Sequence, residues 1–121
     1  TQTVRVHNHS DEPAPWGTGP HPYLVAGPGL VDEWTLELPA DEVLTVTDDR
    51  LIPVSLEPVD TAGAERFDFR RARRIGAVEI DHAYTGFARD DDGFATVRVT
   101  SADGTGVAMT WDTACPWAQI H

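Results

Sequence analysis

The sequence predicts an all-β protein whose strands run antiparallel and are joined by short turns. Apolar and polar residues alternate along several segments, which is typical of half-buried strands. Proline, glycine and aspartate separate these segments, as turn residues do. An amphipathic helix is hard to place anywhere. The 121 residues suit one domain, and several strands separated by short turns fit a sandwich, a barrel or a large curved sheet.

The first alternating segment covers residues 3–9. Its two valines share one face, whereas Arg5, His7 and His9 share the other. The turn formers and prolines that follow are expected to end this strand. Residues 21–25 form a second, short extended run, because a proline favours extended geometry in the residue before it.

Two more strands are expected over residues 34–38 and 42–47, separated by a proline-containing turn. The clearest hairpin pairs residues 94–100 with residues 107–111. Its turn, residues 101–104, contains the Asp-Gly pair that supplies the positive φ of a tight hairpin.

Residues 62–75 contain helix-forming residues. The Phe-Asp-Phe sequence at residues 67–69 fits an extended pair equally well. The pattern therefore favours neither structure in this stretch.

Charge and composition exclude several classes of partner. Nine arginines, no lysine and twenty carboxylates give a formal charge of 9 − 20 = −11. Since phosphate attraction dominates binding to nucleic acid and anionic membranes, we expect neither partner. No apolar run approaches the ~20 residues of a membrane-spanning helix. The lone Cys115 can form no intrachain disulfide, which fits a cytoplasmic protein.

Two positions stand out as candidate site residues. His21 lies between Gly-Thr-Gly-Pro and Pro-Tyr, where the backbone direction is fixed, a ligand can approach closely, and Tyr23 adds an aromatic wall. Asp81 follows the apolar residues 75–80, and a carboxylate at a strand end can accept hydrogen bonds from the hydroxyls of a polar ligand. A loop histidine and a turn aspartate are the alternatives.

Three other features carry weaker hypotheses. His7 and His9 project from one face and could hold a metal with His21 as third ligand; solvated histidines are the alternative. The basic cluster Arg70, Arg71, Arg73 and Arg74 could clamp a phosphate or carboxylate, but we favour pairing with neighbouring acids such as Asp68 and Glu65. Trp117, like Trp16, lies beside a proline and is a candidate surface for sugar stacking.

Five motif groups in a fixed order resemble the aldose 1-epimerase (galactose mutarotase) family. They are NHSDEPAPWGTGPHPYL at 8–24, LPAD at 38–41 with LIPV at 51–54, FDFR at 67–70 with RIG at 74–76, DHAY at 81–84, and WAQIH at 117–121. Together they span nearly the whole chain, and they are most similar to bacterial epimerase-like sugar mutarotases.

The resemblance implies a β-supersandwich isomerase that interconverts the α and β anomers of a free aldose, such as glucose or galactose, with neither metal nor cofactor. It implies that His21, in the His-Pro-Tyr motif, is the general acid toward the ring oxygen. It also implies that Asp81 hydrogen-bonds sugar hydroxyls.

The family's glutamate base would lie beyond His121, and its substrate-binding arginine and another histidine before Thr1. We therefore expect residues 1–121 to be an interior segment of an aldose 1-epimerase-like domain, lacking its N-terminal part and C-terminal end and nearly inactive alone. Exposed sheet edges predict self-association. The alternatives are a non-catalytic carbohydrate-binding module of the same fold and a small His-metal β-barrel.

Overall fold

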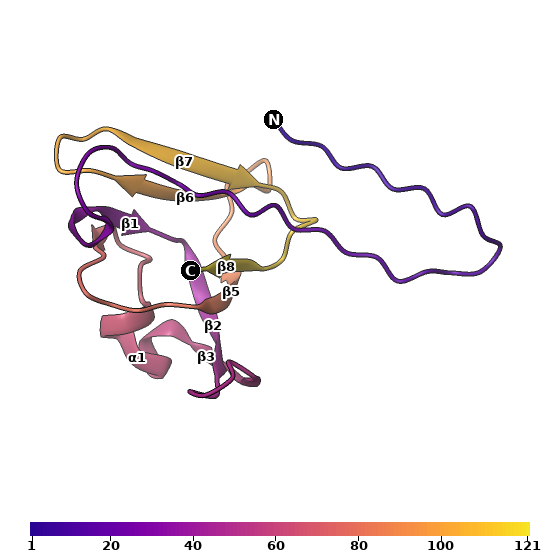
Figure 1. Ribbon diagram of the computed structural model, residues 1–121, viewed down its shortest axis with the longest axis horizontal. Coiled ribbons are helices and arrows are strands. Elements are labelled where there is room, and N and C mark those ends of the chain that lie inside the picture. Colours follow the sequence, from indigo (N-terminus) through magenta and orange to yellow (C-terminus); the bar gives the residue numbers. More distant parts are fainter.

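Residues 1–121, described by a computed structural model, contain two antiparallel four-stranded sheets and one α-helix (Figure 1). In the first sheet the order is β4 (Arg73–Arg74), β1 (Thr35–Glu37), β6 (Ala95–Thr100) and β7 (Gly106–Trp111). In the second the order is β3 (Pro53–Pro58), β2 (Ala40–Val46), β5 (His82–Phe87) and β8 (Ala118–Ile120). A 3-10 turn, η1 (Val31–Glu33), precedes β1. The predicted all-β sandwich is confirmed.

The hydrophobic core draws on both sheets and on the helix. Its fully buried side chains are Leu38, Val43, Val59, Phe69, Tyr84 and Val97. Burying an aliphatic or aromatic side chain of this size contributes roughly 1.5–3 kcal/mol. The core therefore lies between the sheets, and it includes none of residues 1–23.

The β6–β7 hairpin forms as predicted. Val97 and Val99 face the core, whereas Arg98 between them is exposed. Gly104 adopts a φ of +83° in the turn. The Asp103 carboxylate accepts hydrogen bonds from the Ser101 hydroxyl and from the backbone and side chain of Thr105, and these bonds lower its pKa to about 2.

Strand β3 completes a second hairpin, which was not among the predicted strands. It begins at Pro53, ends at Pro58 and pairs with β2, and its other edge has no neighbour. Val54 and Leu56 are exposed on it, at 65% and 43% of their surface. Residues 54–57 do alternate between apolar and polar side chains, but the apolar face is the exposed one.

The helix α1 (Val59–Phe67) occupies part of the stretch for which helix and extended structure fitted equally well. It is kinked at Gly63, where φ is +141°, and it buries Val59 and Phe67 at its two ends. Residues 68–72 then continue without regular structure to β4. The helix therefore forms up to Phe67, and residues 67–69 form no strand pair.

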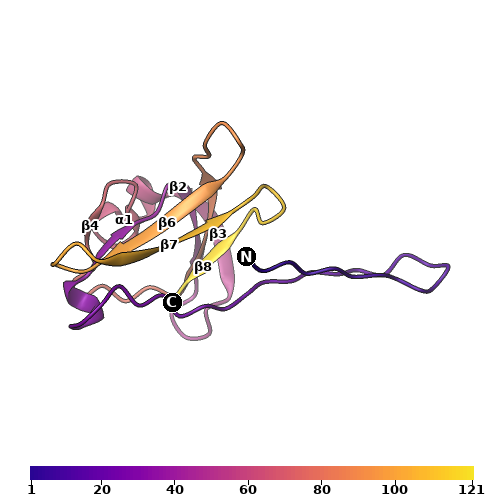
Figure 2. The same cartoon turned by 90° about the horizontal axis from the view of Figure 1, so that it is seen from above.

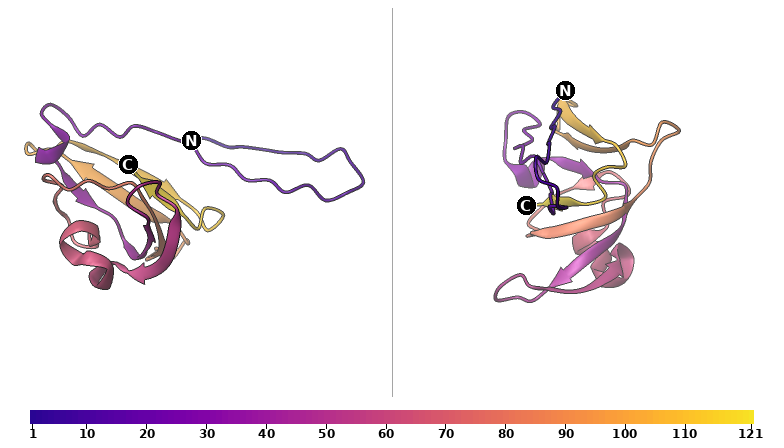
Figure 3. Two further views of the ribbon diagram at one scale, coloured as in Figure 1. Left: turned by 60° about the horizontal axis from the view of Figure 1, so that its bottom comes forward. Right: turned by 90° about the vertical axis from the view of Figure 1, so that its right-hand side faces the viewer.

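Residues 1–20, called the arm below, leave the body as an extended loop (Figure 2). All twenty are exposed, and none belongs to a strand or helix. The arm turns back at Asn8, whose side-chain amide donates to the Glu12 carbonyl at 2.8 Å and whose carboxamide oxygen accepts from Ser10. The left view of Figure 3 shows the same projection, whereas the right view looks along the arm.

The strand predicted over residues 3–9 is therefore wrong, and residues 21–25 also join no sheet. A strand is stabilised by backbone hydrogen bonds to a neighbour. No backbone bond pairs residues 3–9 with another segment of the chain. Residues 3–9 alternate as a strand does, but no neighbouring strand pairs with them.

Candidate functional site

A groove of about 770 Å³ opens between helix α1, the β2–β3 turn and the ends of β5 and β8. Its apolar side chains include Leu36, Phe67, Val78 and Ile80. Its carboxylates are Asp32, Asp48, Glu79 and Asp81. Apolar surface beside carboxylate acceptors suits a ligand with both C–H faces and hydroxyl groups.

Asp81 is the carboxylate of this groove whose side chain contacts other polar side chains. The Gln119 side-chain amide donates to Asp81 Oδ1 at 2.7 Å, and His121 Nδ1 lies 3.7 Å from Oδ2. The Asp81 side chain keeps 37% of its surface exposed, so a ligand can reach it. The carboxylate is thus both held in place and accessible.

The placement of Asp81 at the end of a strand is wrong in one respect. Residues 75–80 form no strand, and Asp81 instead comes directly before β5. The apolar side chains of Ile75, Val78 and Ile80 pack against the core and line the groove without pairing in a sheet. The apolar run is therefore a wall of the groove.

Gln119 was not recognised from the sequence. It stands opposite Ala83 in the β5–β8 pair, and that register brings its side chain to Asp81. To find Gln119 one must know that two segments more than thirty residues apart pair with each other. The alternation within either segment does not contain that information.

His82 forms a buried wall of the groove, with only 4% of its surface exposed. The Asp81 backbone N–H donates to its Nδ1 at 3.1 Å, and its ring packs 4.7 Å from that of Phe67. Burial lowers the pKa of His82, and the nearby Arg66 guanidinium lowers it further. Since Nδ1 accepts a hydrogen bond, a neutral His82 carries its proton on Nε2.

His21 lies outside the groove. It follows the arm in an exposed segment, with its ring 5.3 Å from that of Tyr23. Trp117, 47% exposed and directly before β8, does not line the groove either. Of the three site residues predicted from the sequence, the structure places only Asp81 there.

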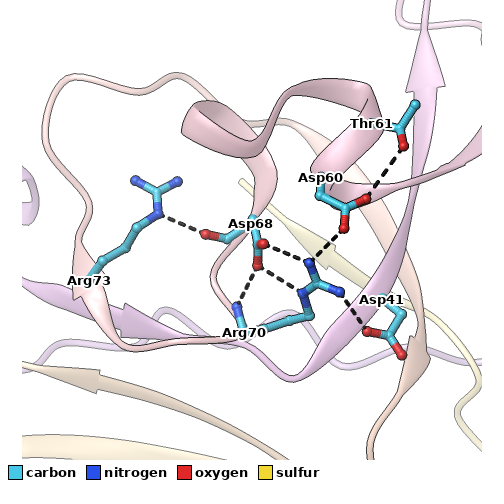
Figure 4. A network of polar contacts seen from close by, with 6 residues as sticks. All are labelled: Asp41, Asp60, Thr61, Asp68, Arg70 and Arg73. Atoms are coloured by element: carbon cyan, nitrogen blue, oxygen red, sulfur yellow. Dashed lines mark hydrogen bonds and ion pairs between the residues drawn. The ribbon is translucent and has the colours of Figure 1, made fainter.

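Within the basic cluster, Arg70 is the centre of a network of ion pairs (Figure 4). The Arg70 guanidinium contacts Asp41 at 3.1 Å, Asp60 at 3.2 Å and Asp68 at 2.7 Å. Hydrogen bonds from Arg70 lower the pKa of Asp68, and those with the three carboxylates raise the pKa of Arg70. With its donors used in this way, Arg70 is no free phosphate clamp.

Arg73 is engaged as well. Its Nε donates to the Asp68 carbonyl at 2.8 Å and one terminal nitrogen donates to the Glu65 carbonyl at 2.9 Å. The guanidinium also covers the Phe69 ring at 3.7 Å. The preferred interpretation, pairing with Asp68 and Glu65, is confirmed for Asp68; at Glu65 the acceptor is the backbone.

The histidines of the arm do not assemble a metal site. The rings of His7 and His9 lie 4.5 Å apart, edge to face. Nowhere in the chain do three histidine, cysteine or carboxylate side chains gather so that they could hold a metal ion. Cys115 is a free thiol. The proposed third ligand, His21, therefore does not join this pair.

No helix has the length and apolar character needed to cross a membrane.

Comparison with known proteins identifies the family of this chain. The model of the aldose 1-epimerase family matches residues 1–121. The uncharacterized protein YihR of Escherichia coli (strain K12) is 39% identical over 71 residues. That match covers 59% of this chain and 22% of YihR, so the chain spans well under two thirds of this relative. No solved structure matches the chain. The match along its whole length shows that the chain belongs to the aldose 1-epimerase family.

Proposed function

We propose that this chain is part of a mutarotase, an isomerase that interconverts the α and β anomers of a free aldohexose. The observation that carries the proposal is the Asp81 carboxylate, held by Gln119 at 2.7 Å in an accessible groove of a chain that belongs to the aldose 1-epimerase family. A carboxylate fixed in this way is ready to accept hydrogen bonds from sugar hydroxyls.

The reaction needs a proton donor and a proton acceptor on one small sugar. His21 gives a proton to the ring oxygen while a glutamate base takes the proton of the anomeric hydroxyl, and the C1–O5 bond breaks to give the open-chain aldehyde. Rotation about C1–C2 presents the other face of the carbonyl. Reclosure returns both protons to where they began, so the reaction is balanced without a cofactor.

The residues of the groove have separate parts in this proposal. Asp81 binds the sugar hydroxyls, and Gln119 is a positioning residue that fixes the Asp81 carboxylate. The buried ring of His82 and the side chain of Phe67 form an apolar wall. Outside the groove, Trp117 offers an exposed aromatic face directly before β8 on which the C–H surface of a sugar can stack.

The 121-residue chain should have little mutarotase activity by itself, because His21 does not line the groove that contains Asp81. Polarimetry of freshly dissolved α-glucose and α-galactose tests this. Acceleration that His21→Ala abolishes would show that the acid reaches the sugar in this chain, contrary to the proposal. In a longer protein that does accelerate the reaction, His21→Ala should lower the rate about 10²–10⁴-fold.

Sugar binding can be measured independently of catalysis. Amide NMR signals of Asp81, His82 and Gln119 should shift as galactose or glucose is added, and Asp81→Asn should reduce the shifts strongly. Asp91→Asn is the matched control, since Asp91 is exposed on the loop before β6. Equal shifts in both variants would remove Asp81 from the proposed site.

The position of His21 outside the groove favours a second candidate, a carbohydrate-binding module that has kept the fold without the chemistry. The enzyme and the binding module can be told apart by measurements on a longer protein that contains this chain. A module binds the sugar through Asp81 and does not accelerate mutarotation, whereas the enzyme does both.

We further propose that the chain self-associates through exposed sheet edges. The outermost strand β7 supports this, since it is hydrogen-bonded to a neighbour on one side only. Unpaired strand edges are templates for another chain.

A further inference from the structure

We propose that His82 is a positioning residue for Asp81, and that protonation of the His82 ring frees the Asp81 backbone and weakens sugar binding in the groove. This rests on the proposed function, because it concerns how Asp81 receives sugar hydroxyls. It adds to that site a control by protonation. Two measurements, one without sugar and one with it, separate the control from the binding.

The backbone of Asp81 lies just outside the sheet. Strand β5 begins at His82, whose partner in β8 is Ile120. The first paired position therefore follows Asp81, and the residues directly before it belong to no strand. The Asp81 N–H donates instead to His82 Nδ1, at 3.1 Å. A side chain, rather than a neighbouring strand, thus receives this N–H.

This hydrogen bond bears on where the Asp81 carboxylate points. A fixed N–H restricts rotation of the Asp81 backbone and so sets the direction of its Cα–Cβ bond. At the other end of the side chain, the Gln119 amide donates to Oδ1 at 2.7 Å. His82 and Gln119 therefore hold the same residue from its backbone and from its carboxylate. Loss of one anchor leaves a binding group with more freedom, which costs affinity when the ligand orders it.

The His82 ring is itself held in place. Only 4% of the residue is exposed, and the ring centre lies 4.7 Å from that of Phe67. Close packing of this kind leaves a ring few orientations. Nδ1 therefore stays beside the Asp81 N–H while the ring also forms a wall of the groove.

The hydrogen bond exists in only one protonation state. A neutral imidazole with its proton on Nε2 has a lone pair on Nδ1 that can accept, whereas an imidazolium carries a proton on both nitrogens. After protonation two N–H groups would point at each other across 3.1 Å. The contact then changes from attraction to repulsion, and Asp81 loses its backbone anchor.

Charges around His82 keep the ring neutral at neutral pH. The Arg66 guanidinium lies over the Phe67 ring at 4.9 Å, and its Nε donates to the Glu79 carbonyl at 2.9 Å. Burial lowers the pKa of His82 and the charge of Arg66 lowers it further, whereas the Asp81 carboxylate raises it. The other titratable side chains that line the groove, from η1, the β2–β3 turn, residues 75–80 and the residue after β8, are Asp32, Asp48, Glu79 and His121.

His121 is the second histidine that can act on Asp81. Its Nδ1 lies 3.7 Å from Asp81 Oδ2. A protonated His121 would attract the carboxylate and compete with sugar hydroxyls for it, without touching the Asp81 backbone. The variant His121→Gln removes this titration and keeps an amide donor.

The measurement without sugar follows the amide NMR signal of Asp81 in the 121-residue chain from mildly alkaline to acidic pH. We expect a step in this signal whose midpoint equals that of the His82 ring signals. His82→Asn places a carboxamide oxygen where Nδ1 was and does not titrate, so it should lose this step and keep the one caused by the Asp81 carboxyl. His121→Gln should keep both. An Asp81 amide signal without a step at the midpoint of the His82 ring would overturn the positioning role.

The measurement with sugar repeats the galactose titration at each pH. The Kd should be constant above the ordinary histidine pKa of 6.5 and then rise as the pH falls, by at most about tenfold per pH unit for one proton. Because binding and protonation are linked, saturating galactose should in turn lower the pKa of His82.

Two substitutions separate the hydrogen bond from packing. His82→Phe keeps a ring beside Phe67 but has no acceptor, so its affinity at neutral pH should be about 2–10-fold lower than that of the wild type. His82→Asn restores an acceptor and should bind more tightly than His82→Phe. Packing alone predicts the opposite order, since phenylalanine fills the space and asparagine does not. Neither variant should show the acid step in affinity.

Arg66 offers a test that leaves His82 in place. Arg66→Met removes a positive charge near the ring, so the loss of affinity should begin at a higher pH than in the wild type. Arg66→Lys keeps the charge and should shift it less. Arg71→Met is the matched control, since Arg71 is exposed and does not line the groove.

The outcomes distinguish the control from the sugar site. An affinity that falls equally in acid in the wild type and in His82→Asn would overturn the role of His82 and leave sugar binding at Asp81 standing. No galactose binding at any pH would overturn the proposed function and the effect on sugar, whereas the amide titration would still decide whether His82 positions Asp81. If both His82 variants fail to fold, as judged by circular dichroism, the wild-type amide titration and the Arg66→Met shift decide.

Discussion

Residues 3–9 and residues 95–100 have the same alternation of apolar and polar side chains, yet only the second segment forms a strand. Strand β6 has neighbours on both sides, β1 and β7, and it buries Val97 to 2% exposure. The arm has no neighbour, and its Val6 stays 55% exposed. Alternation therefore shows that a segment is able to join a sheet, whereas a partner and a core decide whether it does.

The largest effect should come from shortening the same residue type in the two regions. Val97→Ala removes two buried methyl groups from the core and should lower the free energy of unfolding by about 2 kcal/mol. Val6→Ala, the matched change in the arm, should alter it by less than about 0.5 kcal/mol. Chemical denaturation of dilute protein, where any dimer is dissociated, measures both.

Equal losses in the two variants would contradict the contrast between arm and body. A large loss for Val6→Ala that appears only at high protein concentration would sharpen it, because the arm would then gain its partner from a second chain.

The next largest difference between the arm and the body should be in how protonation of their histidines affects stability. His82 is buried in the body and its pKa is lowered, so the unfolded chain binds a proton more readily than the folded chain. Stability should therefore fall as the pH drops below the ordinary histidine pKa of 6.5 and continue to fall down to the lowered pKa of the folded state. The slope is limited to about 1.4 kcal/mol per pH unit for one proton.

Urea denaturation at a series of pH values measures that slope. His82→Phe, which keeps a ring beside Phe67, should flatten the profile in this range. A profile that is unchanged in His82→Phe would mean that another group causes the acid sensitivity.

The smallest expected effect concerns arginines within the basic cluster. Arg70→Met removes three ion pairs and should lower the melting temperature by a few degrees, less in high salt, because the pairs are largely exposed. Arg71→Met is the matched control, since Arg71 is exposed and forms no ion pair. Scanning calorimetry compares them, and equal melting temperatures would show that the network adds no stability.

The Arg70 contribution also has a pH range. The pKa of Asp68 is lowered in the folded chain, so the stability from this pair is present above the ordinary carboxyl pKa of 3.8. It is lost as the pH falls through the lowered value. The difference between the Arg70→Met variant and the wild type should therefore shrink in strong acid.

Patterns within a short stretch of sequence predicted the elements whose partners lie nearby in the sequence. The β6–β7 hairpin was predictable because its alternation and its Asp-Gly turn lie within twenty residues. The strand β5 was not, because it begins with the buried His82 and pairs with β2 and β8, which lie far away in the sequence. The sequence did not distinguish helix from extended structure around α1, because the Phe-Asp-Phe sequence at residues 67–69 fits an extended pair equally well.

The candidate site follows the same division. Asp81 could be found from its motif, but its contact with Gln119 depends on the register of two distant segments. The groove itself combines side chains from residue 31 to residue 121. No single stretch of the sequence contains that arrangement.

The prolines that bound β3 have a consequence for how far assembly can proceed. A chain with two good edges on opposite sheets can grow without limit, as fibrils do. Pro53 and Pro58 make β3 a poor template, so growth from the second sheet stops at each molecule. Within residues 1–121, β7 is therefore the only outermost strand longer than three residues that has no proline at either end.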